Sequence, residues 1–180
     1  MTSSQDPKKA AQCHKCHLEW AAWADTEWRC DLNHHTYLRD APKIGVFGSD
    51  ADHCTDNARA IAYDVGKYLA GRNAIVFTGG GLGVMEAASR GATDAGGIAI
   101  GILAVGDLSR ANPFCSLVIP TGIGFARHQI LTNSVDGAIL IKGGIGTLQE
   151  ATDMYYLRKP IVAITSSGGK AAEIAGTALD

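Results

Sequence analysis

The chain has 180 residues, 46% of them hydrophobic and 22 of them glycine, which suits one compact α/β domain with many tight turns and a short extension. The formal net charge of −2 argues against a broad electrostatic grip on nucleic acid. No apolar run is long enough to span a membrane, and the first residues lack the layout of a signal peptide. We therefore expect a cytoplasmic protein with reduced cysteines and with neither a membrane nor a nucleic-acid partner.

Residues 1–42 differ in composition from the rest of the chain, and we treat them as an N-terminal extension rich in Trp, Cys and His. They contain all three tryptophans, four of the six histidines and three of the five cysteines. A C-x-x-C-H pattern starts at Cys13, but covalent haem belongs to exported proteins, so zinc is the better candidate. The four tetrahedral zinc ligands would be Cys13, Cys16, Cys30 and His34. Alternatively, the cysteines are small hydrophobes in a helical segment that packs on the main domain.

Residues 43–180 alternate between apolar runs and amphipathic segments. The expected strands are 43–47, 74–77, 98–103, 116–119, 137–141 and 161–164. The expected helices are a first one capped by Thr55 and ended by Gly71, followed by 84–95, 127–134, 151–157 and 169–179. This alternation predicts a Rossmann-like three-layer α/β sandwich, in which a parallel sheet of apolar strands is covered by helices on both faces.

The buried face of the first helix follows from its apolar spacing. Residues that recur every three or four positions lie on one side of a helix and are expected to pack on the sheet. This set comprises Ala58, Ile61, Ala62, Val65, Tyr68 and Leu69.

Three glycine-rich loops follow expected strands, and the carboxyl ends of parallel strands share one edge of a sheet. Glycines without a Cβ allow a ligand close to the main chain, and the amide groups of a helix's first turn favour a phosphate. We therefore assign ligand binding to Gly48, Ser49, Thr78, Gly79, Gly80, Gly81, Gly83, Gly143, Gly144, Gly146 and Thr147. A plainer interpretation of the last loop is a capping box, with Thr147 as the N-cap and Glu150 three residues later.

Two charged residues are the candidates for chemistry at this edge. Arg127 starts the helix that leads into strand 137–141, so it can reach an anion bound there and hold it with two hydrogen bonds. Glu150, one turn into the next helix, could orient or deprotonate a water. The dinucleotide motif G-x-G-x-x-G does not follow the first strand and the chain contains no P-loop motif, and we assign no cofactor and no metal to this site.

The segment from Thr78 through Met85 and Glu86, followed by Arg127 and by the stretch from Gly143 to Glu150, resembles the Lonely Guy (LOG) family. This resemblance implies a Rossmann-like homodimer or higher homo-oligomer that hydrolyses the N-glycosidic bond of a nucleoside 5′-monophosphate. It implies that Arg127 and Glu150 are the catalytic pair, and that the glycine loops with Met85 hold phosphate and ribose.

The chain departs from the LOG pattern at several positions. Lys142 stands where the family has proline, and Gly124-Phe125-Ala126-Arg127-His128 replaces the Met-His-x-Arg-Lys signature. These segments resemble a neighbouring branch that includes the molybdenum-cofactor carrier proteins. The alternative function is therefore a non-catalytic carrier or sensor that binds a phosphorylated pterin or a nucleotide.

Overall fold

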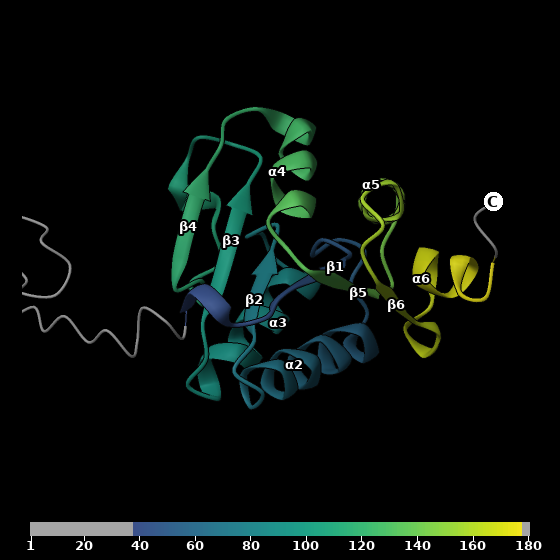
Figure 1. The fold of residues 1–180 in the computed structure, drawn as a ribbon, viewed down its shortest axis with the longest axis horizontal. Helices are drawn as coiled ribbons and strands as arrows, with labels where there is room; N and C mark the ends of the chain where they lie inside the picture. Colours follow the sequence, from purple (N-terminus) through teal and green to yellow (C-terminus); the bar gives the residue numbers. More distant parts are fainter. Residues whose placement is uncertain (1–37, 178–180) are drawn as a thin grey trace, which may run out of the picture. The chain divides into compact units, whose positions relative to one another are not determined.

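The computed structural model describes residues 38–177, of which residues 41–177 belong to one compact unit. Its centre is a parallel sheet with the strand order β4-β3-β2-β1-β5-β6 (Figure 1). The strands are β1 (Lys43–Gly48), β2 (Ile75–Thr78), β3 (Ala99–Leu103), β4 (Leu117–Pro120), β5 (Gly137–Ile141) and β6 (Ile161–Ile164). The predicted parallel sheet is confirmed, whereas the candidate zinc ligands in residues 1–37 lie outside the described part of the chain.

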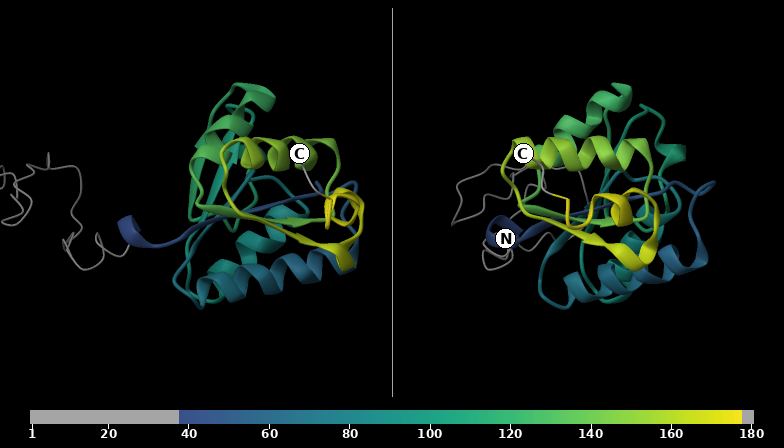
Figure 2. Two further views of the ribbon diagram at one scale, coloured as in Figure 1. Left: turned by 45° about the vertical axis from the view of Figure 1, so that its right-hand side comes forward. Right: turned by 90° about the vertical axis from the view of Figure 1, so that its right-hand side faces the viewer.

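Helices cover both faces of the sheet and complete the three predicted layers. They are α2 (Asp56–Ala70), α3 (Val84–Asp94), α4 (Arg127–Asn133), α5 (Ile145–Tyr156) and α6 (Gly169–Ile174). The pair α2 and α3 lies on one face, and α4 and α5 lie on the other (Figures 1 and 2). None of the described helices is both long and apolar enough to cross a membrane.

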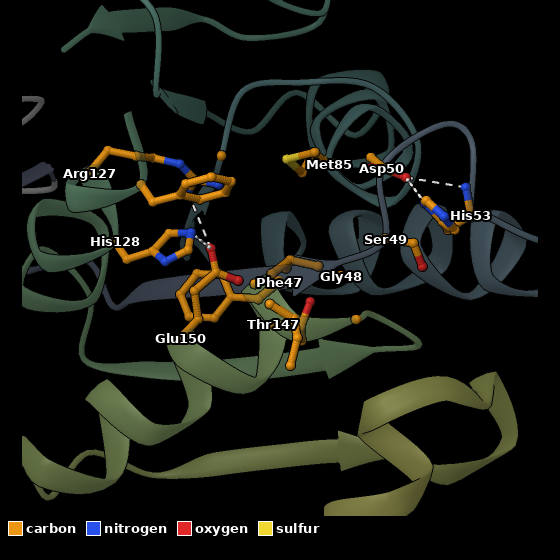
Figure 3. A pocket seen from close by; sticks show the side chains of 16 residues that line it. Phe47, Gly48, Ser49, Asp50, His53, Met85, Arg127, His128, Thr147 and Glu150 are labelled. Carbon is orange, nitrogen blue, oxygen red and sulfur yellow. Dashed lines mark hydrogen bonds and ion pairs between the residues drawn. The ribbon is translucent and has the colours of Figure 1, made fainter. Parts of the chain in front are cut away.

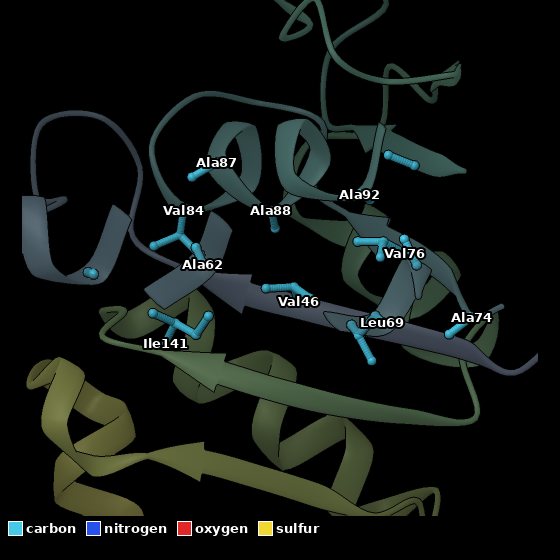
Figure 4. Close-up of a cluster of buried hydrophobic side chains, with 13 residues drawn as sticks. Val46, Ala62, Leu69, Ala74, Val76, Val84, Ala87, Ala88, Ala92 and Ile141 are labelled. Atoms are coloured by element: carbon cyan, nitrogen blue, oxygen red, sulfur yellow. The ribbon is translucent and has the colours of Figure 1, made fainter. Parts of the chain in front are cut away.

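The main hydrophobic cluster lies between the sheet and the pair α2 and α3, and small residues dominate it (Figure 4). Val46 of β1, Val76 of β2 and Ile141 of β5 contribute branched side chains, and the two helices contribute mostly alanines. Gly66 of α2 faces the Ala88 carbonyl of α3 so closely that a Cβ there would overlap with it. The helices therefore pack with their backbones in near contact, and this brings α3 and the loop before it close to β1.

Replacing Gly66 with Val is expected to force α2 and α3 apart and to lower the free energy of unfolding by about 1–3 kcal/mol. The matched control is Gly71→Ala at the end of the same helix, where a Cβ meets only ordinary contacts at 3.5 Å. Urea denaturation of both variants measures the effect. Equal stability of the two variants would contradict the close packing of the helices.

Several local predictions need correction. Tyr68 was expected on the buried face of α2, but it is 56% exposed and stacks under the Arg72 guanidinium, 3.5 Å from the ring centroid. Strand β4 was expected to be covered on both faces, yet Leu117 is 53% exposed because β4 is an edge strand beyond the helical layers. The last helix ends at Ile174 rather than at residue 179, because Ala175 takes an extended conformation. The Thr55 cap is confirmed, since its hydroxyl accepts the Ala58 N–H.

Candidate functional site

A pocket of about 400 Å³ opens at the carboxyl ends of the central strands. Strand β1 lies between β2 and β5, and the chain leaves it towards β2 and returns much later on the β5 side, so the strand order reverses here. Ligands of open parallel sheets bind at such a switch point. The lining residues are Val46, Phe47, Gly48, Ser49, Asp50, His53, Gly79, Met85, Phe125, Arg127, His128, Gly144, Ile145, Gly146, Thr147 and Glu150 (Figure 3).

The first turn of α5 forms one wall of this pocket. Lys142 and Gly143 have φ values of 55° and 74°, and this left-handed turn lets the helix begin at Ile145 directly after β5. The N-cap is Gly144, and no side chain caps the helix. The prediction that Thr147 is the N-cap is therefore wrong: Thr147 lies inside the helix and packs beneath Gly143. The first amide groups of α5 and the positive end of its dipole therefore face the pocket, and no capping side chain accepts a hydrogen bond from these amides.

Arg127 and Glu150 meet in the same pocket as the glycine loops (Figure 3). Arg127 follows the 3₁₀ turn Gly124–Ala126 at the start of α4, and its Nη1 donates to Glu150 Oε1 over 3.2 Å. The two side chains are only 13% and 6% exposed. The two side chains therefore form a largely buried ion pair at one side of the cavity.

Burial has opposite consequences for the two charges of this pair. It raises the pKa of Glu150 to about 7, although the Arg127 charge and hydrogen bond act in the other direction. Burial also lowers the pKa of Arg127, which the Glu150 carboxylate partly offsets. A carboxyl group whose pKa lies near neutrality can exchange a proton with a bound molecule at physiological pH.

The raised pKa of Glu150 predicts a pH-dependent stability. Because the folded-state value of about 7 exceeds the ordinary 4.5, the folded protein binds the proton more tightly than the unfolded chain does. This contribution is complete below pH 4.5 and is lost as the pH rises through 7. Relative to Glu150→Gln, the wild type should lose roughly 3 kcal/mol of unfolding free energy between pH 4.5 and 8. Urea denaturation of both proteins across this range measures it, and parallel curves would contradict the shift.

Five of the residues assigned to ligand binding lie behind the pocket wall and shape its loops. Hydrogen bonds within the chain hold these loops: the buried Thr78 hydroxyl accepts the Gly80 N–H, and the Gly143 N–H donates to the Ser49 hydroxyl. The other seven line the pocket directly, as do both catalytic candidates, Arg127 and Glu150. The five in the supporting layer are Thr78, Gly80, Gly81, Gly83 and Gly143.

Asn112 holds the second glycine loop in place, a role that the sequence did not reveal. It is 2% exposed, and its side-chain amide donates to the carbonyls of Gly80 at 3.1 Å and Gly81 at 3.0 Å. Its own backbone N–H also donates to Gly80, and its side-chain oxygen accepts the Phe114 N–H. Asn112 lies in the connection between β3 and β4, so only the folded chain brings it to this loop.

Other lining residues were also missed as ligand contacts. Asp50 and His53 pair over 2.7 Å on the side of the pocket away from Arg127 (Figure 3), and Phe125, which also lines the pocket, is 77% exposed. Asp50 directly follows Gly48-Ser49 and Phe125 lies two residues before Arg127, so proximity to a predicted motif was the signal available. Within residues 38–177, no three His, Cys, Asp or Glu side chains lie together as metal ligands would.

Several solved structures and curated proteins are similar to this chain. The solved structure of the structural-genomics target TM1055 has a TM-score of 0.71 at 33% identity, covering 77% of this chain and 83% of its own. A molybdenum cofactor binding protein from Rippkaea orientalis has a TM-score of 0.65 at 36% identity, covering 67% and 74%.

An enzyme is also among the relatives. The cytokinin riboside 5′-monophosphate phosphoribohydrolase of Mycobacterium tuberculosis is 32% identical over 117 residues, which are 60% of this chain and 63% of the enzyme. The chain thus matches somewhat less than two thirds of that enzyme's length. A family model described as the SLOG cluster4 family matches residues 41–178. Because this match covers most of the chain, the protein belongs to the SLOG cluster4 family, a LOG-like group with a Rossmann-type fold.

Proposed function

We propose that the protein hydrolyses the N-glycosidic bond of a purine nucleoside 5′-monophosphate and releases the free base and ribose 5-phosphate. The observation that carries this proposal is the buried pair of Arg127 and Glu150 in one pocket with the uncapped start of α5. Similarity to the mycobacterial phosphoribohydrolase supports the same activity.

The amide groups of Ile145, Gly146 and Thr147 would hold the 5′-phosphate, since a helix N-terminus favours an anion and has unused donors. Glycine at positions 144 and 146 lets the phosphate approach the main chain. The ribose would then extend towards Arg127 and Glu150, which lie in the same cavity.

The proposed chemistry requires a nucleophile and stabilisation of positive charge on the sugar. Glu150 in its ionised form takes a proton from a water, and the water oxygen bonds to C1′ as the bond from C1′ to the base nitrogen breaks. The electron pair of that bond leaves with the base, which then takes up a proton. The carboxylate stabilises the oxocarbenium-like sugar, while Arg127 fixes Glu150 and the ligand in position.

Incubation with AMP, followed by chromatography for adenine and ribose 5-phosphate, tests the proposal. Adenosine is the matched control substrate, because it offers the same glycosidic bond without the phosphate that α5 would hold. We expect release from AMP and at least tenfold slower release from adenosine, a loss in line with one charged hydrogen-bonding group. Absence of adenine from AMP would reject the proposed activity.

A second function is a carrier for a phosphorylated pterin, and the 36% identity to a molybdenum cofactor binding protein favours it. The same phosphate cradle would serve, with no bond broken. This function predicts that molybdenum cofactor adds RT ln(1 + [L]/Kd) to the free energy of unfolding, so that the melting temperature rises with its concentration, and that the cofactor is recovered unchanged. Absence of stabilisation by the cofactor would exclude the carrier function.

We also propose that the protein forms a homodimer or higher homo-oligomer, which sedimentation analysis would detect.

A further inference from the structure

His128 lies directly behind the ion pair, and its environment is unusual for a histidine. Only 2% of the residue is exposed, and its Nε2 lies 3.4 Å from Glu150 Oε1, the same oxygen that accepts from Arg127. Its other ring nitrogen, Nδ1, is buried and has no hydrogen-bond partner in the described chain. The ring also packs edge-on against Phe125 with centroids 6.0 Å apart.

These contacts determine where the ring proton resides. A neutral imidazole has one donor nitrogen and one acceptor nitrogen, and burying a donor without an acceptor costs more than burying a lone pair. Glu150 Oε1 is the acceptor beside Nε2, so Nε2 carries the proton and Nδ1 does not. Burial and the adjacent Arg127 charge both lower the pKa of His128, which keeps the ring neutral at physiological pH.

We infer that His128 is a positioning residue for Glu150: its Nε2–H and Arg127 together hold Oε1, so that the second oxygen, Oε2, is presented to the ligand. Figure 3 shows Oε2 turned towards the middle of the pocket, while the dashed lines from Arg127 and His128 both end on the other oxygen. A contact of 3.4 Å is long for a hydrogen bond, and such contacts at active sites commonly tighten when ligand binds. The neutral donor favours the ionised form of Glu150, the form that accepts a proton from water.

The charged and titratable groups around this pair are few. Arg127 lies at the start of α4. Asp153 lies one turn after Glu150 on α5, and its charge raises the pKa of both Glu150 and His128. The Gln149 side chain also raises the pKa of His128. Strand β3, which packs against α4, has no titratable side chain. On α6, Lys170 and Glu173 form an ion pair with each other. Asp153 Oδ2 is buried without a hydrogen-bond partner in the described chain.

The test compares His128→Gln, whose amide can donate in place of Nε2–H, with His128→Leu, which fills similar space without a donor. The first readout is carbon NMR titration of the Glu150 carboxyl in ligand-free protein, assigned by its loss in Glu150→Gln. We expect His128→Leu to raise the Glu150 pKa by about one unit and His128→Gln to leave it near the wild-type value. The second readout is nitrogen NMR of the wild-type ring, which should show a neutral ring protonated at Nε2.

The inference rests on the proposed function only for its kinetic consequence, so the two can fail separately. If AMP is hydrolysed, the acid limb of the kcat profile should move up by the same unit in His128→Leu and be restored in His128→Gln. If AMP is not hydrolysed, the two NMR measurements still test whether His128 positions Glu150. An Nδ1-protonated ring, or the same Glu150 pKa in wild type and His128→Leu, would overturn the positioning role even if the leucine variant were less stable.

Discussion

Replacing Glu150 with Gln is expected to lower kcat for AMP hydrolysis by about 10²–10⁴-fold, the range that a positioned general base contributes. The amide has nearly the same shape and can still contact Arg127, but it cannot take a proton from water. Affinity for ribose 5-phosphate should change by no more than about threefold, because the phosphate is held at α5 by main-chain amides. Initial rates and calorimetric titration measure the two effects.

The matched control is Glu173→Gln on α6, where the side chain is 60% exposed and pairs with Lys170 at the surface. It removes the same charge away from the pocket and should leave kcat unchanged. Equal kcat for wild type and Glu150→Gln would show that the reaction does not use this carboxylate. Loss of phosphate affinity and kcat together would indicate a damaged site rather than a missing base.

Replacing Arg127 with Met is expected to lower kcat/KM for AMP by about 10²–10³-fold, as removal of a preorganised electrostatic partner does elsewhere. The buried Glu150 would also lose the charge that holds its pKa down, so the carboxyl should stay protonated at pH 7. Part of the lost activity should therefore return at higher pH. A rate profile from pH 6 to 10 measures this recovery.

Arg90→Met is the matched control for this change, because Arg90 pairs with Asp94 on the exposed side of α3 with 57% of its side chain accessible. This variant should keep the wild-type rate and pH profile. An Arg127→Met enzyme with an unshifted acid limb would contradict the electrostatic coupling between Arg127 and Glu150, whatever its absolute rate.

Much of the fold follows from local patterns in the sequence. The runs that became β1, β2 and β5 are mostly apolar because helices cover both faces of the central strands, and such runs are visible without any tertiary information. Which strands lie at the edges of the sheet cannot be predicted from such local patterns. Strand β4 has the composition of a buried strand but is exposed, because the strand order alone decides which strands lie at the edges.

The candidate site could be predicted in part, for a similar reason. Glycine loops after strands place Gly48, Gly79 and Gly144 at one sheet edge, and all three line the pocket. The start of α5 was misplaced because Lys142 adopts a left-handed conformation that its residue type does not favour. The Asn112 clamp depends on a contact 32 residues away in sequence, which no local pattern encodes.

The choice between hydrolase and carrier depends on the site rather than on the fold, since one scaffold can support both. Both functions use the start of α5 for a phosphate. Only hydrolysis needs an ionisable Glu150 beside the anomeric carbon, so AMP turnover by the Glu150 and Arg127 variants tests the hydrolase function, whereas stabilisation of the wild type by molybdenum cofactor tests the carrier function.

The most direct test of the account is a crystal structure of the Glu150→Gln variant with AMP. We expect the phosphate within hydrogen-bond distance of the main-chain amides at the start of α5, with C1′ of the ribose next to residue 150 and Arg127. A phosphate bound instead at the separate hollow formed by Tyr155, Arg158 and Lys159, or a ribose turned away from residue 150, would contradict it.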